Sequence, residues 1–301
     1  MWGLRLKHSF GIVQSGLIVL SLVFSACGSK TAPLDGYAQE PSPWPEAPSD
    51  FVPGTREKPN GCTDEAQGIV LLSADGGLYR LSPPKLALTT IGKMSCDSPL
   101  TSMSLARDGT FWGAGEDGLL YKSSGTGCES TGLNLRVKNE DRFGTGIVAD
   151  ENGRDHLFVA PIGLRPVGKD TFVSNVPELI DVTLGQRPHL RHVPYSLDTS
   201  NMEFAGTGDS RLFALSDPNL IVITQLDPSD GSTLEKHYIS DLEYLGAYDF
   251  CYWQGDFYLF NSTSAGTSDV FRYRVSTRQL EPVGTVPIVV IGAESTTCAP
   301  L

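Results

Sequence analysis

Lysine and arginine are scarce in this chain of 301 residues, where 23 basic residues stand against 35 acidic ones and the formal net charge is −12. Proteins that bind DNA or RNA need clustered lysine and arginine to displace counterions from the phosphates. An acidic chain of this composition lacks that electrostatic footprint. We therefore expect no nucleic-acid partner.

The motifs of the common enzyme families are also missing. The chain has no Gly-x-Ser-x-Gly, no His-Glu-x-x-His, no phosphate-binding loop and no dinucleotide fingerprint. His189 and His192 form a close pair, but an i, i+3 spacing on a strand turns the two rings to opposite faces. Residues 150–155 lack the bidentate glutamate of a calcium loop, and their Asn-Gly step predicts a turn. We predict no metal and no cofactor.

Long stretches of helical periodicity are absent from residue 62 onward. Short apolar runs alternate there with Gly, Asp, Asn and Ser, the pattern of strands separated by tight turns. Hydrophobic residues make up 40% of the chain, which is enough for a sizeable core. The 32 glycines and 20 prolines fall short of the share that marks a low-complexity chain. The composition excludes a wholly disordered protein and the pattern predicts an all-β fold.

The N-terminus has the parts of a signal peptide. Arg5 and Lys7 supply positive charge, and residues 12–24 form an apolar segment of 13 residues. A helix of that length spans about 20 Å, too short for a hydrocarbon core of about 30 Å. We predict a signal sequence rather than a membrane-spanning helix.

The end of this segment, Phe-Ser-Ala-Cys at residues 24–27, resembles a bacterial lipobox. The resemblance implies that residues 1–26 are a lipoprotein signal peptide and that Cys27 is acylated, with palmitate-like chains that hold the protein on a membrane. The alternative is an ordinary signal-peptidase site with a free cysteine nearby. Gly28 after the cysteine suggests, by analogy with the enterobacterial sorting rule, the outer membrane of a bacterial cell envelope, on its periplasmic or surface face.

Residues 27–61 are predicted to be a tether. Four prolines lie within residues 41–48, and the segment has no apolar periodicity. Such sequence favours extended polyproline II and holds a domain away from a surface. Removal of the signal takes away Arg5 and Lys7 but no acid, so the mature net charge is −14. Lipid rather than charge would then hold the protein to the membrane.

Residues 62–301 contain a weak internal repeat. Five segments share an anchor strand after a turn, and an apolar run precedes each of them except the first. In most of them a third strand of apolar–aromatic–basic order follows, and an outer strand can end in Gly, as at residues 88–92 and 280–284. The anchors lie 42, 46, 55 and 45 positions apart. Their first apolar residues are Ile69, Phe111, Leu157, Leu212 and Phe257.

Four strands per unit at a period of 40 to 55 residues are typical of a β-propeller. We predict one propeller of five blades. A six-bladed ring is the alternative, because in the longest unit residues 164–168 resemble an outer strand and residues 179–182 a third strand. A pair of β-sandwiches is a further alternative, but it leaves the repeat unexplained.

The two ends of the repeat region predict how the ring closes. The anchor at Ile69 has no apolar strand before it, and residues 288–292 form an apolar strand with no anchor after it. If the C-terminal strand joins the first blade, both features are explained. Closure of this kind leaves only short exposed sheet edges.

Five cysteines remain beside Cys27. Cys62 and Cys298 both fall in the closed first blade, so we predict that they form a disulfide worth about 4 to 5 kcal/mol by loop entropy. Cys96 and Cys128 end the outer segments of adjacent blades and form the second predicted disulfide. Cys251 lies in an aromatic run and is predicted to be a buried free thiol.

The lipobox-like segment, the five anchors and the closing residues 295–300 together resemble the secreted bacterial β-propeller lipoproteins of the WD40/YVTN-like repeat superfamily. Many members of that group have no assigned activity, and a propeller does not fix a function. We expect a monomeric, membrane-tethered module that binds or scaffolds a protein, a peptide or a glycan. A purely structural envelope lipoprotein is a further possibility.

The alternative class is a propeller enzyme, a lyase or hydrolase with its site at the mouth of the central channel. Four acids follow or flank the predicted inner strands: Asp108, Glu116, Asp209 and Glu294. Acidic residues are common in the turns between strands. We therefore assign no catalytic residue among them.

Overall fold

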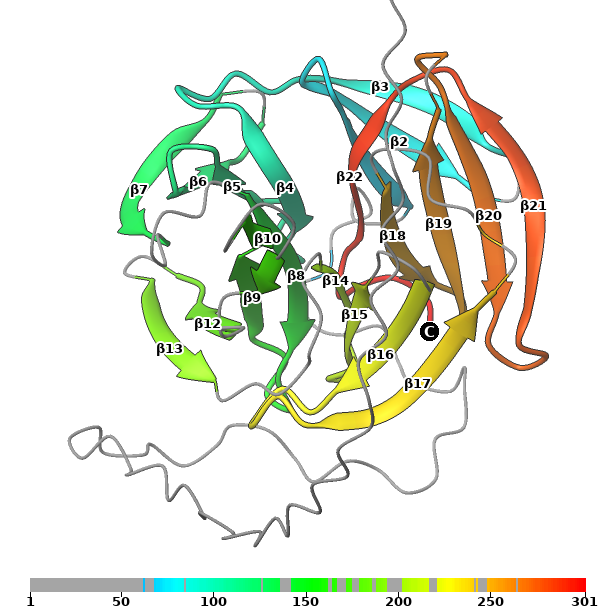
Figure 1. The fold of residues 1–301 in the computed structure, drawn as a ribbon. Coiled ribbons are helices and arrows are strands. Elements are labelled where there is room, and N and C mark those ends of the chain that lie inside the picture. Colours follow the sequence, from blue (N-terminus) through cyan, green and yellow to red (C-terminus); the bar gives the residue numbers. More distant parts are fainter. Residues whose placement is uncertain are drawn as a thin grey trace, which may run out of the picture. The chain divides into compact units, whose positions relative to one another are not determined.

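The computed structural model is an all-β ring of five antiparallel, four-stranded blades, a five-bladed β-propeller (Figure 1). Two compact units are distinguished, Met1–Glu40 and Pro41–Leu301, and only the second holds described residues. The structure describes residues 62, 68–83, 85–125, 127–135, 142–161, 164–166, 172–174, 179–185, 188–193, 202–216, 221–240, 242, 248–263 and 265–301. The predicted signal peptide, Cys27 and the whole predicted tether (residues 27–61) lie outside these residues.

Each blade is an antiparallel meander whose first strand lies at the inner edge of the ring and whose last strand lies at the outer edge. Blade 1 holds β22 (Val290–Ser295), β1 (Ile69–Ser73), β2 (Gly77–Ser82) and β3 (Ala87–Lys93). Blade 2 holds β4 (Leu100–Leu105), β5 (Phe111–Gly115), β6 (Leu119–Ser123) and β7 (Glu129–Asn134). Blade 3 holds β8 (Phe143–Ala149), β9 (Asp155–Pro161), β12 (Leu179–Thr183) and β13 (His189–Val193).

The remaining two blades follow the same order. Blade 4 holds β14 (Met202–Gly206), β15 (Leu212–Ser216), β16 (Ile221–Leu226) and β17 (Thr233–Ile239). Blade 5 holds β18 (Tyr248–Trp253), β19 (Asp256–Ser262), β20 (Ser268–Arg274) and β21 (Gln279–Val286). In the part of the chain that is described, no helix is long and apolar enough to cross a membrane.

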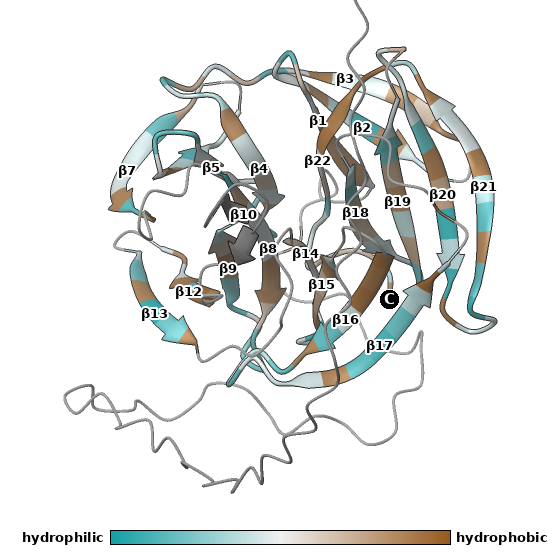
Figure 2. Cartoon of the chain, in the orientation of Figure 1, coloured by the Kyte–Doolittle hydropathy of each residue, from teal (hydrophilic) through white to brown (hydrophobic). Residues whose placement is uncertain are grey.

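The anchor strands are buried on both faces, which explains their uniform apolar character. Every residue of β1, β5 and β15 is buried, because each blade packs between two neighbours. The outer strands carry more polar residues, as Figure 2 shows for β13 and β17. Burial of these apolar faces between blades is the main driving force for the ring.

The long third repeat unit is a single blade with an inserted hairpin, so the six-bladed alternative is wrong. Residues 179–183 form β12, the third strand of blade 3, as their sequence predicts. Residues 164–166, which resemble an outer strand in sequence, instead form β10 (Leu164–Pro166) and pair with β11 (Phe172–Ser174). These short strands pair with each other outside the blade, and the hairpin accounts for the spacing of 55 residues.

The ring closes through strands from both ends of the repeat region, as predicted. β22 pairs with β1 in an antiparallel register from Ile69 opposite Ser295 to Ser73 opposite Val290. The red strand β22 therefore lies in the same blade as the blue strands of the N-terminal part (Figure 1). The strand begins two residues later than predicted, because the Ser268 hydroxyl donates to the Ile288 carbonyl and accepts from the Val290 N–H.

Both predicted disulfides are present in the structure. Cys62 and Cys298 are joined across 236 residues with a Cα–Cα distance of 5.7 Å. Cys96 and Cys128 are joined across 32 residues with a Cα–Cα distance of 4.7 Å, and they link blades 1 and 2. Cys251 on β18 is a buried free thiol, in agreement with the sequence analysis.

We predict that the disulfide Cys62–Cys298 stabilises the fold more than Cys96–Cys128 does. The longer loop restricts the unfolded chain more, so replacing both of its cysteines by alanine should lower the free energy of unfolding by about 5 kcal/mol, against about 4 kcal/mol for the other pair. Urea unfolding of the two double variants measures the difference. An equal or smaller loss for the Cys62/Cys298 variant would contradict the prediction.

Candidate functional site

Polar side chains from every inner strand meet at the axis of the ring. The inner strands β22, β4, β8, β14 and β18 each contribute at least one of them. None of these side chains belongs to a residue that is more than 7% exposed. We call this set the axial cluster, and its members are Ser102, Ser104, Thr145, Glu203, Asp249 and Glu294.

Hydrogen bonds join the axial cluster across the ring. The Ser102 hydroxyl donates to Glu203 Oε2 at 3.2 Å and lies 2.9 Å from Thr145 Oγ1. Blades 2 and 4 are not neighbours, so the bond from Ser102 to Glu203 spans the axis. Ser104 Oγ lies 3.0 Å from Thr145 Oγ1 and 3.2 Å from Glu294 Oε2. The chain of bonds thus connects four of the five blades.

The fifth blade contributes Asp249, which is held by main-chain donors. Its Oδ1 accepts from the Phe250 N–H at 2.6 Å, and its Oδ2 accepts from the Ala293 N–H at 3.0 Å. Ala293 belongs to β22, so this carboxyl group also joins blade 5 to blade 1. Buried carboxyl groups need such partners, because an unsatisfied one costs several kcal/mol.

The three axial acids favour their neutral forms. Burial raises the pKa of Asp249 to about 8. Burial, followed by the charge of Asp249, raises the pKa of Glu203 and of Glu294 well above the ordinary value. Protonation therefore removes most of the negative charge that would otherwise accumulate at the axis. Perturbed acids of this kind are characteristic of catalytic sites, but also of buried polar networks.

The C-terminal segment 296–301 covers one end of the axis. The inner strands begin at one face of the ring, which we call the N-face, and end at the other, the C-face. On the C-face, Thr297 Oγ1 accepts from Arg107 Nη2 at 3.3 Å and donates to Asp155 Oδ1 at 2.8 Å. A Cβ atom on Gly208 would lie 2.0 Å from the Thr297 carbonyl oxygen, and Gln254 N–H donates to the Pro300 carbonyl. The segment therefore contacts blades 2, 3, 4 and 5.

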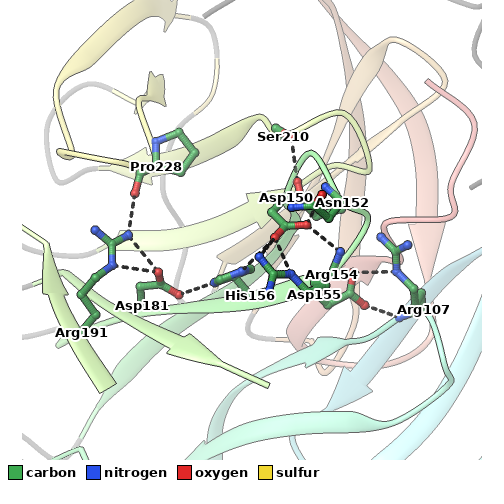
Figure 3. Close-up of polar contacts among 11 residues, drawn as sticks. Arg107, Asp150, Asn152, Arg154, Asp155, His156, Asp181, Arg191, Ser210 and Pro228 are labelled. Atoms are coloured by element: carbon green, nitrogen blue, oxygen red, sulfur yellow. Dashed lines mark hydrogen bonds and ion pairs between the residues drawn. The ribbon is translucent and has the colours of Figure 1, made fainter. Parts of the chain in front are cut away.

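Arg107 and Asp155 form a partly buried ion pair beside this segment (Figure 3). Asp155 Oδ1 accepts from Arg107 Nε at 2.9 Å, and its Oδ2 accepts from the Arg107 main-chain N–H at 2.7 Å. The pair joins blade 2 to blade 3. Arg107 Nη2 and Asp155 Oδ1 also hold Thr297 in position.

Blade 3 carries a second polar network, also drawn in Figure 3. His156 lies between two buried acids, with Nδ1 2.9 Å from Asp181 Oδ1 and Nε2 3.6 Å from Asp150 Oδ2. Arg191 binds Asp181 at 2.8 Å and donates to the Pro228 carbonyl of blade 4. These contacts tie blade 3 to blade 4 and account for the charged groups structurally.

A pocket of about 340 Å³ lies on the N-face between blades 1 and 2. It is formed by the β1–β2 turn, the connection 94–99 and the first residues of the inner strands. Its lining is partly apolar and partly polar, and comprises Leu72, Ser73, Ala74, Asp75, Gly76, Met94, Ser95, Cys96, Ser98, Pro99, Leu100 and Ile291. Its size is in the range of small-molecule sites.

The structure separates the four acids that the sequence places near the inner strands. Only Glu294 belongs to the axial cluster. Asp108 accepts from the Thr110 N–H and fixes a turn, and Asp209 pairs with Arg211 at 3.0 Å on the C-face. Glu116 lies in the β5–β6 turn of the N-face.

The two segments considered as metal motifs lie on an outer strand and in a turn. His189 and His192 are both exposed on the outer strand β13. Residues 150–155 form the predicted turn, in which Asp150 Oδ1 accepts from the N–H groups of Asn152 and Arg154. Across the described residues, no group of three or more His, Cys, Asp and Glu side chains is placed to hold a metal ion.

Sequence analysis missed most of the axial cluster. Glu203 and Asp249 each interrupt an apolar run near the start of an inner strand, and a lone carboxylate in such a run could have been noticed. Ser102 and Thr145 carry no comparable signal, because small hydroxyl residues are common in strands and turns.

Comparison with known proteins finds solved structures that are similar to this chain in their fold. No protein-family model matches the chain, and no curated protein matches it in sequence. TolB from Acinetobacter baumannii aligns over 72% of this chain and 52% of its own, with a TM-score of 0.45 and 14% identity. The chain thus spans about half the length of TolB. A gluconolactonase from Xanthomonas campestris aligns over 83% of this chain and 90% of its own, with a TM-score of 0.45 and 12% identity. At these scores the similarities carry no argument about activity.

We predict that Glu203→Gln weakens the pH dependence of stability. The folded chain favours protonated Glu203, whereas the unfolded chain ionises it near its ordinary pKa of 4.5. The contribution of Glu203 to the free energy of unfolding is therefore fully present below that pH. It is lost as the pH rises toward the raised pKa that Glu203 has in the folded chain. Glutamine can still accept from Ser102 but cannot ionise. Between about pH 5 and about pH 8, the free energy of unfolding in urea should fall less in the variant than in the wild type.

Glu281→Gln is the matched control. Glu281 is a half-exposed acid whose pKa is lowered by its hydrogen bond from Arg274, so it is ionised in both states throughout this range. Its stability curve should run parallel to that of the wild type. A Glu203→Gln curve that is also parallel to the wild type would refute the assignment of a protonated axial acid.

Proposed function

We propose that the protein is an envelope-tethered lipoprotein whose propeller binds a protein, a peptide or a glycan through its N-face. The observation that carries this proposal is the difference between the two faces of the ring. The pocket between blades 1 and 2 opens on the N-face, whereas the C-terminal segment covers the axis on the C-face. Among the described residues, the N-face therefore offers a concave surface to a ligand.

The hairpin β10–β11 supports the same choice of face. β9 ends at Pro161, which pairs with Phe143 at the start of inner strand β8, so the insertion leaves blade 3 at the N-face. Insertions between the strands of a rigid scaffold are where binding residues gather in many folds. The proposed binding module acts as a monomer, held near the membrane by the tether 27–61 and acylated Cys27.

A second candidate function is the propeller enzyme, and the axial acids favour it. A protonated carboxyl group such as Asp249 or Glu203 is suited to donate a proton as a general acid. Both residues are less than 8% exposed, and the C-terminal segment covers the C-face end of the axis. A substrate would have to displace that segment or enter from the N-face. A ligand bound in the N-face pocket need neither displace that segment nor reach the buried acids, and we favour binding for that reason.

If the protein is tethered through acylated Cys27, the variant Cys27→Ser should lose both acylation and membrane association. This change removes the thiol that would carry the acyl chains, so the variant should incorporate no labelled palmitate and should leave the membrane fraction of its bacterial host. Cys251→Ser is the control, because the Cys251 thiol is buried and remains in the propeller core. Unchanged palmitate labelling of Cys27→Ser would disprove the lipoprotein assignment.

If the N-face pocket is the binding surface, a bulky side chain placed in it should prevent ligand binding. Ser95 is exposed and lines the pocket, so Ser95→Trp should block it without disturbing the core. Labelled full-length wild-type protein is applied to an array of peptides and envelope glycans to find the ligands that it retains. Ser95→Trp should bind those ligands with an affinity at least about tenfold lower than that of the wild type. Ser276 is also an exposed serine and lies in the β20–β21 turn, so the control variant Ser276→Trp should keep these ligands.

Two outcomes of the array experiment would reject the proposed function. Ligands retained equally by Ser95→Trp and by the wild type would exclude the N-face pocket as the binding surface. Cleavage of an array member by the wild type, abolished in Glu203→Gln, would establish the enzyme instead.

A further inference from the structure

The N-face pocket combines an apolar wall with a carboxylate at its rim. Met94 and Leu72 belong to the core shared by blades 1 and 2, and Leu100, Ile291 and Cys96 pack against that core while remaining half-buried. These half-buried side chains leave apolar surface inside the pocket. An apolar group placed against them would lose contact with water at a gain of roughly 25 cal/mol per Å² buried.

The carboxylate is Asp75, in the β1–β2 turn. Its Oδ1 accepts from the Ser73 hydroxyl and from the Gly77 N–H at 3.3 Å. These two hydrogen bonds, with Ser73 the stronger, lower the pKa of Asp75 and fix the orientation of its carboxylate. Ser73 is itself buried, and its hydroxyl is anchored further by the Gly77 carbonyl.

The equivalent turn of blade 2 shows what Asp75 lacks. Asp117 occupies the same place before Gly118, and its Oδ1 accepts from the Leu119 N–H at 3.0 Å. Its Oδ2 is bound by the Tyr121 hydroxyl at 2.7 Å. In blade 1, no side chain among the described residues donates to Asp75 Oδ2 or forms an ion pair with Asp75. Lys93 on β3 and the main-chain N–H of Asp75 itself contribute only weak attractions. The repeat thus leaves Oδ2 of Asp75, a residue that lines the pocket, without a side-chain partner among the described residues.

We propose that this pocket binds a primary alkylammonium group, with the ammonium on Asp75 Oδ2 and the alkyl chain against Leu100, Ile291 and Met94. The proposal deepens the proposed function and rests on its choice of the N-face. The net charge of −12 also favours a cationic ligand over an anionic one. The group can come from a free aliphatic amine or from the side chain of a lysine in a peptide.

The four methionines of the chain give a direct measurement. In full-length protein labelled at the methionine methyl groups, Met94 reports on the pocket, and Met202, buried in blade 4, serves as an internal reference. The Met94→Leu variant assigns the signal. The probe is n-butylammonium, which reproduces a lysine side chain, and n-butanol and butyrate are its neutral and anionic controls.

We expect n-butylammonium to shift the Met94 signal in a saturable way and to leave Met202 unchanged. Asp75→Asn should weaken this binding about fivefold, the factor expected from one partly exposed ion pair. Asp108→Asn is the matched control, since Asp108 also accepts from the N–H two residues ahead, but on the C-face. It should bind the probe as the wild type does.

A lysine tripeptide with blocked ends, compared with its norleucine analogue, separates the two sources. Binding of the lysine tripeptide supports a peptide ligand, and binding of n-butylammonium alone supports a free amine. The proposal is overturned if Met94 does not respond, if n-butanol or butyrate binds equally well, or if Asp75→Asn binds as tightly as the wild type. The array experiment tests the proposed function independently of these outcomes, because the larger ligands on the array contact the whole N-face.

Discussion

The closure of the ring through β22 and β1 is the constraint on which the rest of the structure depends. Each blade buries two apolar faces, so every blade needs a neighbour on both sides, and the first and last meet only if the C-terminal strand completes blade 1. The disulfide Cys62–Cys298 fixes this junction covalently. The same segment that closes the ring then continues as residues 296–301 and covers the axis on the C-face.

Closure also brings charged groups into a place where they are costly. Five inner strands converge on the axis, and three of them carry Glu203, Asp249 and Glu294. The protein accommodates these acids by hydrogen bonds from Ser102, from Ser104 and from main-chain N–H groups, and by protonation. A network that links blades that are not neighbours, such as blades 2 and 4, fixes the positions of these blades relative to one another. The axial cluster therefore has a sufficient structural reason to exist, whatever further role it has.

The two faces of the ring differ for a reason that follows from connectivity. The chain ends on the C-face, where ion pairs such as Arg107–Asp155 hold the terminal segment. The connections between blades and the insertion after β9 leave from the N-face, where chain length can vary without opening the ring. The repeated turns of blades 1 and 2 diverge there as well, because Asp117 is bound by Tyr121 while Asp75 Oδ2 has no side-chain partner among the described residues. A repeat protein acquires individual sites where its repeats differ.

The sequence by itself determined the fold class, the five blades, the strand that closes the ring and both disulfide partners. These features depend on local patterns, namely anchor strands apolar along their length at a period of 42 to 55 residues, and on cysteines at the ends of strands. The tertiary structure alone decided that residues 164–166 belong to an inserted hairpin, because a short strand has the same sequence pattern inside a blade and outside it. It alone assembled the axial cluster and the N-face pocket. Ser102 meets Glu203, and Leu100 lines the same pocket as Ile291, only after segments far apart in the chain are packed into a ring.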